Sequence, residues 1–256
     1  MLKRAKCTIY MAQEGDTLGK DSELAATLAQ GKPVIAYVRE IKGGELKKFA
    51  AELENRPLRY FRQRLLTLLA DGFFDKPDNR RKVTELAAQL SLSLVPEGLV
   101  KEVYDVLRIL DEFERGRRFQ LIGDDDERFR TTHTADIGRF AKLFAAIESR
   151  AADNRADTIK TRHPLGMQVH LETGVGNGVL VARNEKQCAD LVRAVLTRNL
   201  EFCISLLRDP QTTQVIGTVL LEKATKSRFR VVTKDECLTN SFWNFYLEEE
   251  PPRSGK

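Results

Sequence analysis

The sequence has few of the residues that mark disulfide-rich and metal-binding proteins. Its 256 residues include only four cysteines and three histidines. The cysteines, which have apolar neighbours and form no Cys-x-x-Cys pair, are Cys7, Cys188, Cys203 and Cys237. This spacing argues against a disulfide framework or a zinc site and favours small buried thiols in a reducing compartment. We therefore expect no metal site.

Long apolar runs are absent from the sequence as well. No run approaches the roughly 20 residues of a membrane-spanning helix. The chain starts with the basic stretch 1–6, but the apolar run behind that stretch is too short for a signal peptide. We therefore expect a soluble, cytoplasmic protein that does not enter a membrane.

The excess of positive charge is small. Lysine and arginine total 42 against 37 acidic residues, a net charge of +5 with a pI near 9.0. Two arginine clusters are candidates for phosphate contacts: Arg56, Arg59, Arg62 and Arg64, and then Arg115, Arg117 and Arg118. At these helical spacings a solvated helix face beside a core stripe is favoured over a nucleic-acid interface, because phosphate binding needs basic side chains that converge. Nucleic acid is therefore an unlikely partner.

The middle of the chain, residues 43–160, is predicted to be a helical region. Apolar residues recur at the spacing of one helix face, and proline or glycine separates the segments. The predicted helices cover residues 45–53, 58–70, 80–94, 97–114 and 135–152.

The pattern changes after Pro164, and residues 161–247 are predicted to form an α+β domain, followed by a disordered polar tail at 248–256. Strand patterns cover 167–171, 179–182, 201–207, 214–222 and 228–233, and a helix capped by Asn184 runs to Leu196. The glycines at 174, 176 and 178 lie in a predicted turn. Because they lack the spacing of a dinucleotide-binding loop, a glycine-rich hairpin is the favoured interpretation.

The first 42 residues are predicted to form a partial α/β unit. Cys7–Met11 and Val34–Val38 are apolar, strand-like runs, and a polar loop and a short helix lie between them. This order predicts a parallel strand pair with a crossover helix, whose first loop borders a ligand crevice. Such a unit cannot close a doubly wound sheet. Either the chain is a truncated version of a longer architecture, or a partner chain supplies the missing strands.

The segment between these two strands carries a family resemblance. Asp16-Thr17-Leu18-Gly19, Ser22-Glu23-Leu24-Ala25 and Gly31-Lys32-Pro33-Val34-Ile35 stand in order along it. Together they resemble the C-terminal half of a TIR-like or nucleoside 2-deoxyribosyltransferase-like domain, over residues 6–40. The resemblance implies an α/β fold with a partial doubly wound parallel sheet, a TIR/flavodoxin-like half.

The resemblance also implies a function. In these families the glutamate equivalent to Glu23 is the catalytic carboxylate that cleaves an N-glycosidic bond. Asp16, Thr17 and Ser22 would then contact the ribose or the base. The substrate would be NAD or a nucleoside, with no separate cofactor, and the context would be bacterial signalling or defence.

Three alternatives stay open at this point. Glu23 is equally suited to complement the dipole of its helix, with Asp21 or Ser22 as the cap. The chain as a whole is compatible with a non-catalytic binding or assembly module, including a homo-oligomer. A nucleic-acid binder that uses the arginine clusters is the third.

The histidines His133, His163 and His170 have no acidic partner at metal spacing and are expected to be structural.

Overall fold

The computed structural model describes residues 6–12, 33–117, 129, 134–162, 167–170, 174–209 and 211–233. The chain divides into two compact units. One stretch, Glu40–Asp153, forms a helical unit. The segments on either side of it, Met1–Arg39 and Asn154–Lys256, together form an α/β unit.

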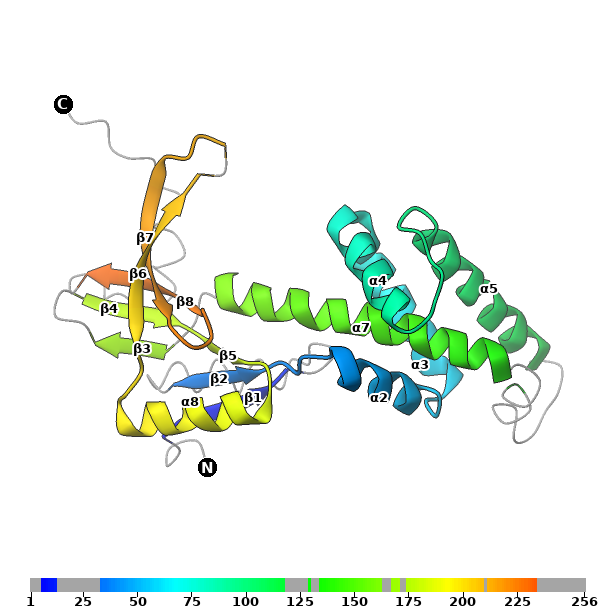
Figure 1. The fold of residues 1–256 in the computed structure, drawn as a ribbon, viewed down its shortest axis with the longest axis horizontal. Coiled ribbons are helices and arrows are strands. Elements are labelled where there is room, and N and C mark those ends of the chain that lie inside the picture. The colour runs from blue at the N-terminus through cyan, green and yellow to red at the C-terminus, as the bar shows by residue number, and fades with distance from the viewer. Residues whose placement is uncertain are drawn as a thin grey trace. The chain divides into compact units, whose positions relative to one another are not determined.

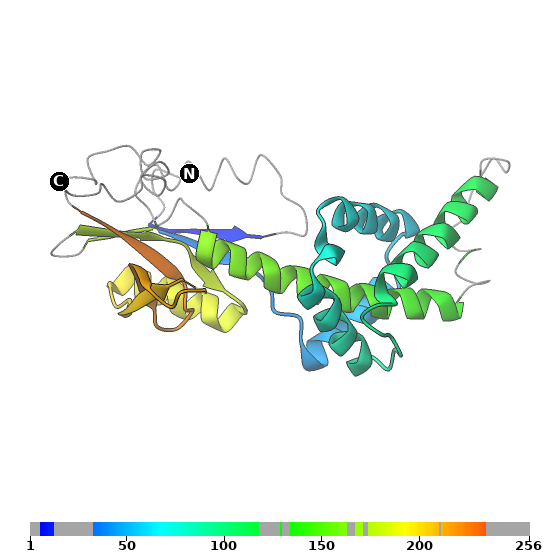
Figure 2. The ribbon, with the colours of Figure 1, turned by 90° about the horizontal axis from the view of Figure 1, so that it is seen from above.

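The helical unit confirms the helices that were expected from apolar periodicity, except that the helix expected over 80–94 ends at Gln89. Its elements are α2 (Gly43–Leu53), α3 (Leu58–Ala70), η2 (Phe73–Asp75), α4 (Pro77–Gln89), α5 (Leu99–Arg117) and the first part of α7 (Thr134–Arg162). Figure 2 shows α7 as one unbroken helix. The apolar stripes of these helices meet in one core, in which the rings of Phe61 and Phe144 pack edge to face at 4.6 Å.

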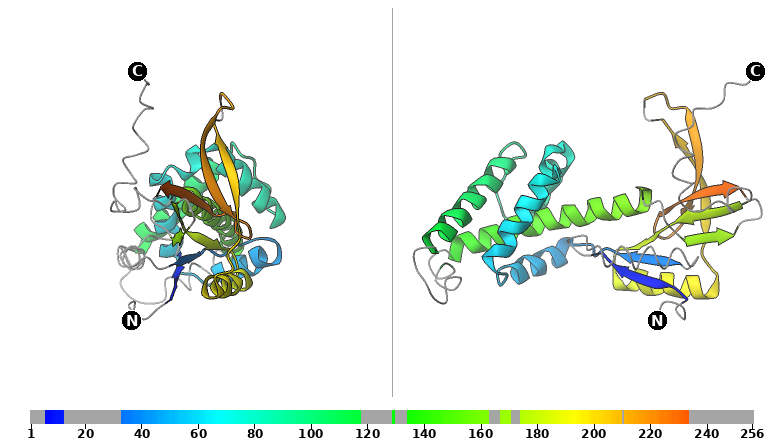
Figure 3. Two further views of the ribbon diagram at one scale, coloured as in Figure 1. Left: turned by 90° about the vertical axis from the view of Figure 1, so that its left-hand side faces the viewer. Right: turned by 180° about the vertical axis from the view of Figure 1, so that it is seen from behind.

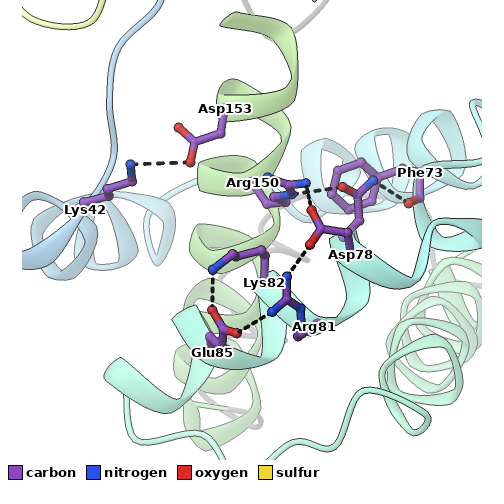
Figure 4. A network of polar contacts seen from close by, with 9 residues as sticks. Lys42, Phe73, Asp78, Arg81, Lys82, Glu85, Arg150 and Asp153 are labelled. Carbon is purple, nitrogen blue, oxygen red and sulfur yellow. Dashed lines mark hydrogen bonds and ion pairs between the residues drawn. The ribbon is translucent and has the colours of Figure 1, made fainter. Parts of the chain in front are cut away.

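Polar contacts fix α7 within this unit. The Arg64 guanidinium donates to both carboxylate oxygens of Glu148, at 2.6 and 3.1 Å, and Glu148 is buried. The Ser149 hydroxyl donates to the carbonyl oxygen of Ile41 at 2.6 Å. In Figure 4, Arg150 of α7 reaches Asp78 at the start of α4. These bonds satisfy polar groups that burial would otherwise penalise.

The α/β unit contains a three-stranded parallel sheet made of β1 (Thr8–Met11), β2 (Val34–Tyr37) and β5 (Leu180–Ala182). Strand β2 is central and pairs with both neighbours, Thr8 lying opposite Val34 and Ala36 opposite Val181 (Figure 1). The predicted parallel pairing of the two N-terminal strands is thereby confirmed.

Helices cover both faces of this sheet. On one face, Cys188 and Leu191 of α8 (Glu185–Thr197) pack against Ile35 and Tyr37. On the other face, the last turns of α7 contribute Arg155, whose guanidinium donates to the Tyr10 hydroxyl at 3.4 Å. All four β2 residues are buried, which explains why this strand has an uninterrupted apolar sequence.

A five-stranded antiparallel sheet completes the unit in the order β3-β4-β8-β7-β6. Its strands are β3 (Met167–His170), β4 (Gly174–Gly178), β6 (Phe202–Arg208), β7 (Val215–Glu222) and β8 (Arg228–Thr233). The β6–β7 hairpin extends beyond the end of β8, as Figure 3 shows, because β8 pairs only with residues 219–221 of β7.

The two sheets join where β4 leads into β5, with only Val179 between them. A Cβ added at Gly178 would lie 2.4 Å from the carbonyl oxygen of Arg228 and 2.7 Å from the Phe229 ring, so the neighbouring strand β8 lies too close for a side chain at this position. The Ser227 hydroxyl, which is buried, accepts a hydrogen bond from the backbone N–H of Val181 at 3.0 Å. This bond caps the outer edge of β5.

The structure differs from the sequence-based expectations in three places. Residues 1–42 and 161–247 were expected to be separate domains, but β5 pairs with β2 and places both in one unit. The same pairing shows that a later part of this chain adds a strand to the N-terminal pair. Finally, Gly174–Gly178 forms strand β4 and is not a turn, although it does form an antiparallel hairpin with β3, as expected.

Candidate functional site

The four residues predicted to form the site, Asp16, Thr17, Ser22 and Glu23, lie outside the described residues. The strands that flank them are described. Strand β1 ends at Met11 and β2 begins at Val34, and the two run parallel. The segment that carries the predicted site therefore leaves one end of the sheet and returns to the opposite end.

The carboxyl ends of the three parallel strands lie together at one end of the sheet, which we call its carboxyl edge. The Ala12 N–H donates to the carbonyl oxygen of Tyr37 at 3.0 Å, and the Val38 N–H donates to that of Ala182 at 2.9 Å. The three segments that leave these strands thus start side by side. In open parallel sheets this edge is where ligands bind, so we regard it as the candidate site.

Among the described residues, Tyr37 and Glu185 form the principal polar contact at this edge. The Tyr37 hydroxyl, at the end of β2, donates to Glu185 Oε1 at 2.9 Å, although the two residues are 148 positions apart in the chain. Burial raises the pKa of Tyr37, and the hydrogen bond to Glu185 and the charge of that carboxylate raise it further. The nearby charge of Arg39 opposes this shift. Tyr37 therefore stays a hydrogen-bond donor to higher pH than an ordinary tyrosine.

The start of α8 holds Glu185 in place. Asn184 caps the helix, its side-chain oxygen accepting from the Gln187 N–H at 2.8 Å. In return, Gln187 Oε1 accepts from the Arg183 N–H at 2.7 Å. Glu185 lies in the first turn of α8 and is exposed, where the helix dipole favours a negative charge. The edge therefore presents a fixed carboxylate to solvent.

Neither Tyr37 nor Glu185 was among the site residues predicted from sequence. Residues 180–185 do carry a signal, because a strand is followed there by an Asn that can cap a helix and then by an acidic residue. This order is typical of a helix that follows a parallel strand. That signal identifies the start of a helix but not which strand lies beside it. Only the pairing of β2 with β5 brings Glu185 to Tyr37.

The thiols and histidines show no metal site within the described residues, where no three possible ligands gather. Burial raises the pKa of the Cys7 and Cys188 thiols, so both are poor nucleophiles at neutral pH. Cys203 is exposed on β6, contrary to the expectation that the cysteines are buried. His170 lies in β3, while His133 and His163 fall outside the part of the chain that the structure describes.

The first arginine cluster makes intramolecular contacts. Arg62 pairs with Asp111 at 2.7 Å, Arg64 pairs with Glu148, and the Arg56 guanidinium lies 5.5 Å from the centre of the Tyr60 ring. Arg62 and Arg64 thus already have acidic partners within the chain. Within the described residues, no helix is long and apolar enough to cross a membrane.

Comparisons with known proteins add no relative, since no family model, curated protein or solved structure matches the chain.

Proposed function

We propose that this protein is a TIR-like, N-glycosidase-type protein that acts on NAD or a nucleoside, with Glu23 as its catalytic carboxylate. The proposal rests on the resemblance of residues 6–40, and the parallel pairing of β1 with β2 is the observation that supports it most. In this arrangement the predicted loop leaves β1 at the carboxyl edge of the sheet, beside Tyr37. The proposed fold is half of a doubly wound, flavodoxin-like sheet.

The proposed reaction breaks the bond between the anomeric carbon of ribose and the base nitrogen. The electron pair of that bond leaves with the base, and positive charge develops on the anomeric carbon and the ring oxygen. An ionised Glu23 stabilises this charge or attacks the carbon as a nucleophile. Water then supplies the hydroxyl group of the product, and its remaining proton passes to the base or the solvent.

Other residues of this edge would orient the substrate. Asp16, Thr17 and Ser22 are proposed to hydrogen-bond the ribose hydroxyls or the base. Glu185, fixed by Tyr37, adds a second carboxylate at the same edge of the sheet. By the same resemblance, we propose a role in bacterial signalling or defence inside the cytoplasm.

Base release from NAD and from nucleosides, followed by chromatography, tests this proposal. We expect release by the wild type and a loss of about 100-fold or more with Glu23→Gln, because the substitution removes the charge that stabilises the transition state. Glu14→Gln is the matched control, since it neutralises a carboxylate of the same segment that the proposal leaves without a role. No release by the wild type, or equal release by Glu23→Gln, would refute the proposal.

A non-catalytic binding or assembly module is the second candidate. It is favoured by the exposed apolar side chains of Ile9 and Met11 on β1. A stable oligomer that binds neither NAD nor nucleosides in calorimetry would support it over the enzyme.

Nucleic-acid binding is the third candidate, but Arg62 and Arg64 already have acidic partners. A DNA or RNA affinity that does not fall with salt would argue against phosphate contacts altogether.

A further inference from the structure

Two residues of different chemistry, Glu185 and Met11, lie next to Tyr37 at the carboxyl edge of the parallel sheet. The Tyr37 hydroxyl donates to Glu185 Oε1 at 2.9 Å, and Met11 is the residue opposite Tyr37 in the β1–β2 ladder. Residues directly opposite each other in a ladder have their side chains on the same face of the sheet. Because Tyr37 packs against Cys188 of α8, Met11 lies on the face that α8 covers. A carboxylate and an apolar side chain therefore border the same end of one sheet face.

Both of these side chains reach solvent. Glu185 is exposed, and Met11 is 52% exposed. Together they offer a hydrogen-bond acceptor beside a polarizable apolar surface. A nucleoside has matching parts, since its sugar carries hydroxyl donors and its base is a flat ring system. Ligand sites of this kind combine a few placed polar groups with apolar contact area.

The carboxylate of Glu185 is suited to a ligand that donates hydrogen bonds. An ionised carboxylate accepts through two oxygens with about four lone-pair sites, and it donates none. The bond from Tyr37 uses one of these sites. A phosphate group would be repelled by the negative charge, whereas the two adjacent hydroxyls of ribose supply a pair of donors. Doubly wound sheets hold ribose in the same way, through an acidic residue near the ligand crevice.

The start of α8 orders this carboxylate before any ligand binds. Asn184 caps α8 by accepting from the Gln187 N–H at 2.8 Å, and Gln187 Oε1 accepts from the Arg183 N–H at 2.7 Å. The bond from Tyr37 then restrains the Glu185 side chain itself. A side chain that is already ordered loses less conformational entropy on binding than a mobile surface glutamate does.

We propose that Glu185 selects ribonucleosides over 2′-deoxyribonucleosides by accepting hydrogen bonds from the 2′- and 3′-hydroxyl groups, while Met11 contacts the face of the base. This inference rests on the proposed function, because it names the sugar that the same edge of the sheet accepts. Tyr37 is a positioning residue, since it holds Glu185 and does not touch the ligand. The substrate class is thereby narrowed to ribosides, either free or as part of NAD.

Equilibrium binding of adenosine, uridine and their 2′-deoxy forms tests this selectivity. Calorimetry uses the full chain with Glu23→Gln as the background, so that the nucleosides stay intact during the measurement. We expect each ribonucleoside to bind about 10-fold more tightly than its 2′-deoxy form, because the deoxy form lacks one hydrogen bond to a charged acceptor. Glu185→Ala should bring the two affinities together. Asp190→Ala is the matched control, since it removes another exposed carboxylate of α8, and it should keep the preference.

Two further variants separate the contact with the base from the contact with the sugar. Met11→Ser should weaken ribose and 2′-deoxyribose forms by the same factor, about 5-fold, because both forms share the base. Glu185→Gln keeps the shape of the side chain and one acceptor oxygen, so it should retain part of the preference for ribose. A circular dichroism spectrum like that of the wild type would show that each variant is folded.

The outcomes distinguish this inference from the proposed reaction. Ribose-selective binding that depends on Glu185, without base release by the wild type, would refute the N-glycosidase and support the role of Glu185. Equal affinity for the two sugars, or a preference that Glu185→Ala retains, would overturn that role even if the wild type releases base. Binding of none of the four nucleosides would overturn it as well. Unchanged affinities in Met11→Ser would overturn the contact with the base.

Discussion

The helical unit uses one uninterrupted stretch of chain, whereas the α/β unit is assembled from two stretches that the helical unit separates. In the helical unit, each helix is specified by its own apolar periodicity, and the polar contacts tie together helices already specified in this way. In the α/β unit, β2 and β5 are neighbours in the sheet although more than half of the chain lies between them. Local sequence therefore specifies the first unit far more completely than the second.

Breaking the buried ion pair of the helical unit should have the largest effect. Arg64→Leu leaves the buried carboxylate of Glu148 without its cation, and we expect a loss of about 3–5 kcal/mol in the free energy of unfolding. Hydrogen exchange should locate the loss in α3 and the first part of α7, with the parallel sheet unaffected. Adding Glu148→Leu should regain most of this stability. Lys48→Leu, which breaks an exposed pair with Glu45, should cost less than about 0.5 kcal/mol.

The complementary experiment disturbs the α/β unit. Gly178→Ala places a methyl group against the backbone of β8, and we expect a loss of about 3 kcal/mol, because a backbone contact of this kind cannot relax as a flexible side chain would. Chemical denaturation and hydrogen exchange should show the loss in β4, β5 and β8. Gly44→Ala is the control, since its added methyl group meets nothing within 4 Å, and stability there should change by less than about 1 kcal/mol. Equal losses for both variants would mean that the close approach of β8 does not restrict residue 178.

The smallest expected effect concerns the candidate site. The pKa of Tyr37 is raised in the folded protein, so its contribution to stability is complete below the ordinary tyrosine pKa of about 10 and is lost as the pH rises through the folded-state value. Tyr37→Phe should cost about 1 kcal/mol at neutral pH through the lost bond to Glu185. The cost should shrink above about pH 10. A cost that grows with pH in unfolding measurements would contradict the assigned direction.

Most secondary structure was predictable from particular residues. Asn184 predicted the start of α8, and the stripe from Leu58 to Leu68 predicted α3 with the observed bounds. The turn expected at Gly174–Gly178 is strand β4, and glycine is required at position 178 because Arg228 and Phe229 of the neighbouring strand β8 leave no room for a side chain. No local pattern around Gly178 indicates that Arg228 and Phe229 approach it.

The candidate site was predictable only in part, again because local patterns do not indicate contacts between distant segments. The sequence by itself determined the helices, most of the strands and the parallel pairing of the two N-terminal strands, since periodicity and capping are properties of neighbouring residues. The tertiary structure alone decided that β5 joins this pair, that Tyr37 meets Glu185 and that Ser227 caps the outer edge of β5. These contacts join segments that lie far apart in the sequence, and the strand pairings among them use backbone groups that nearly every residue carries, so they leave no signature in the local sequence.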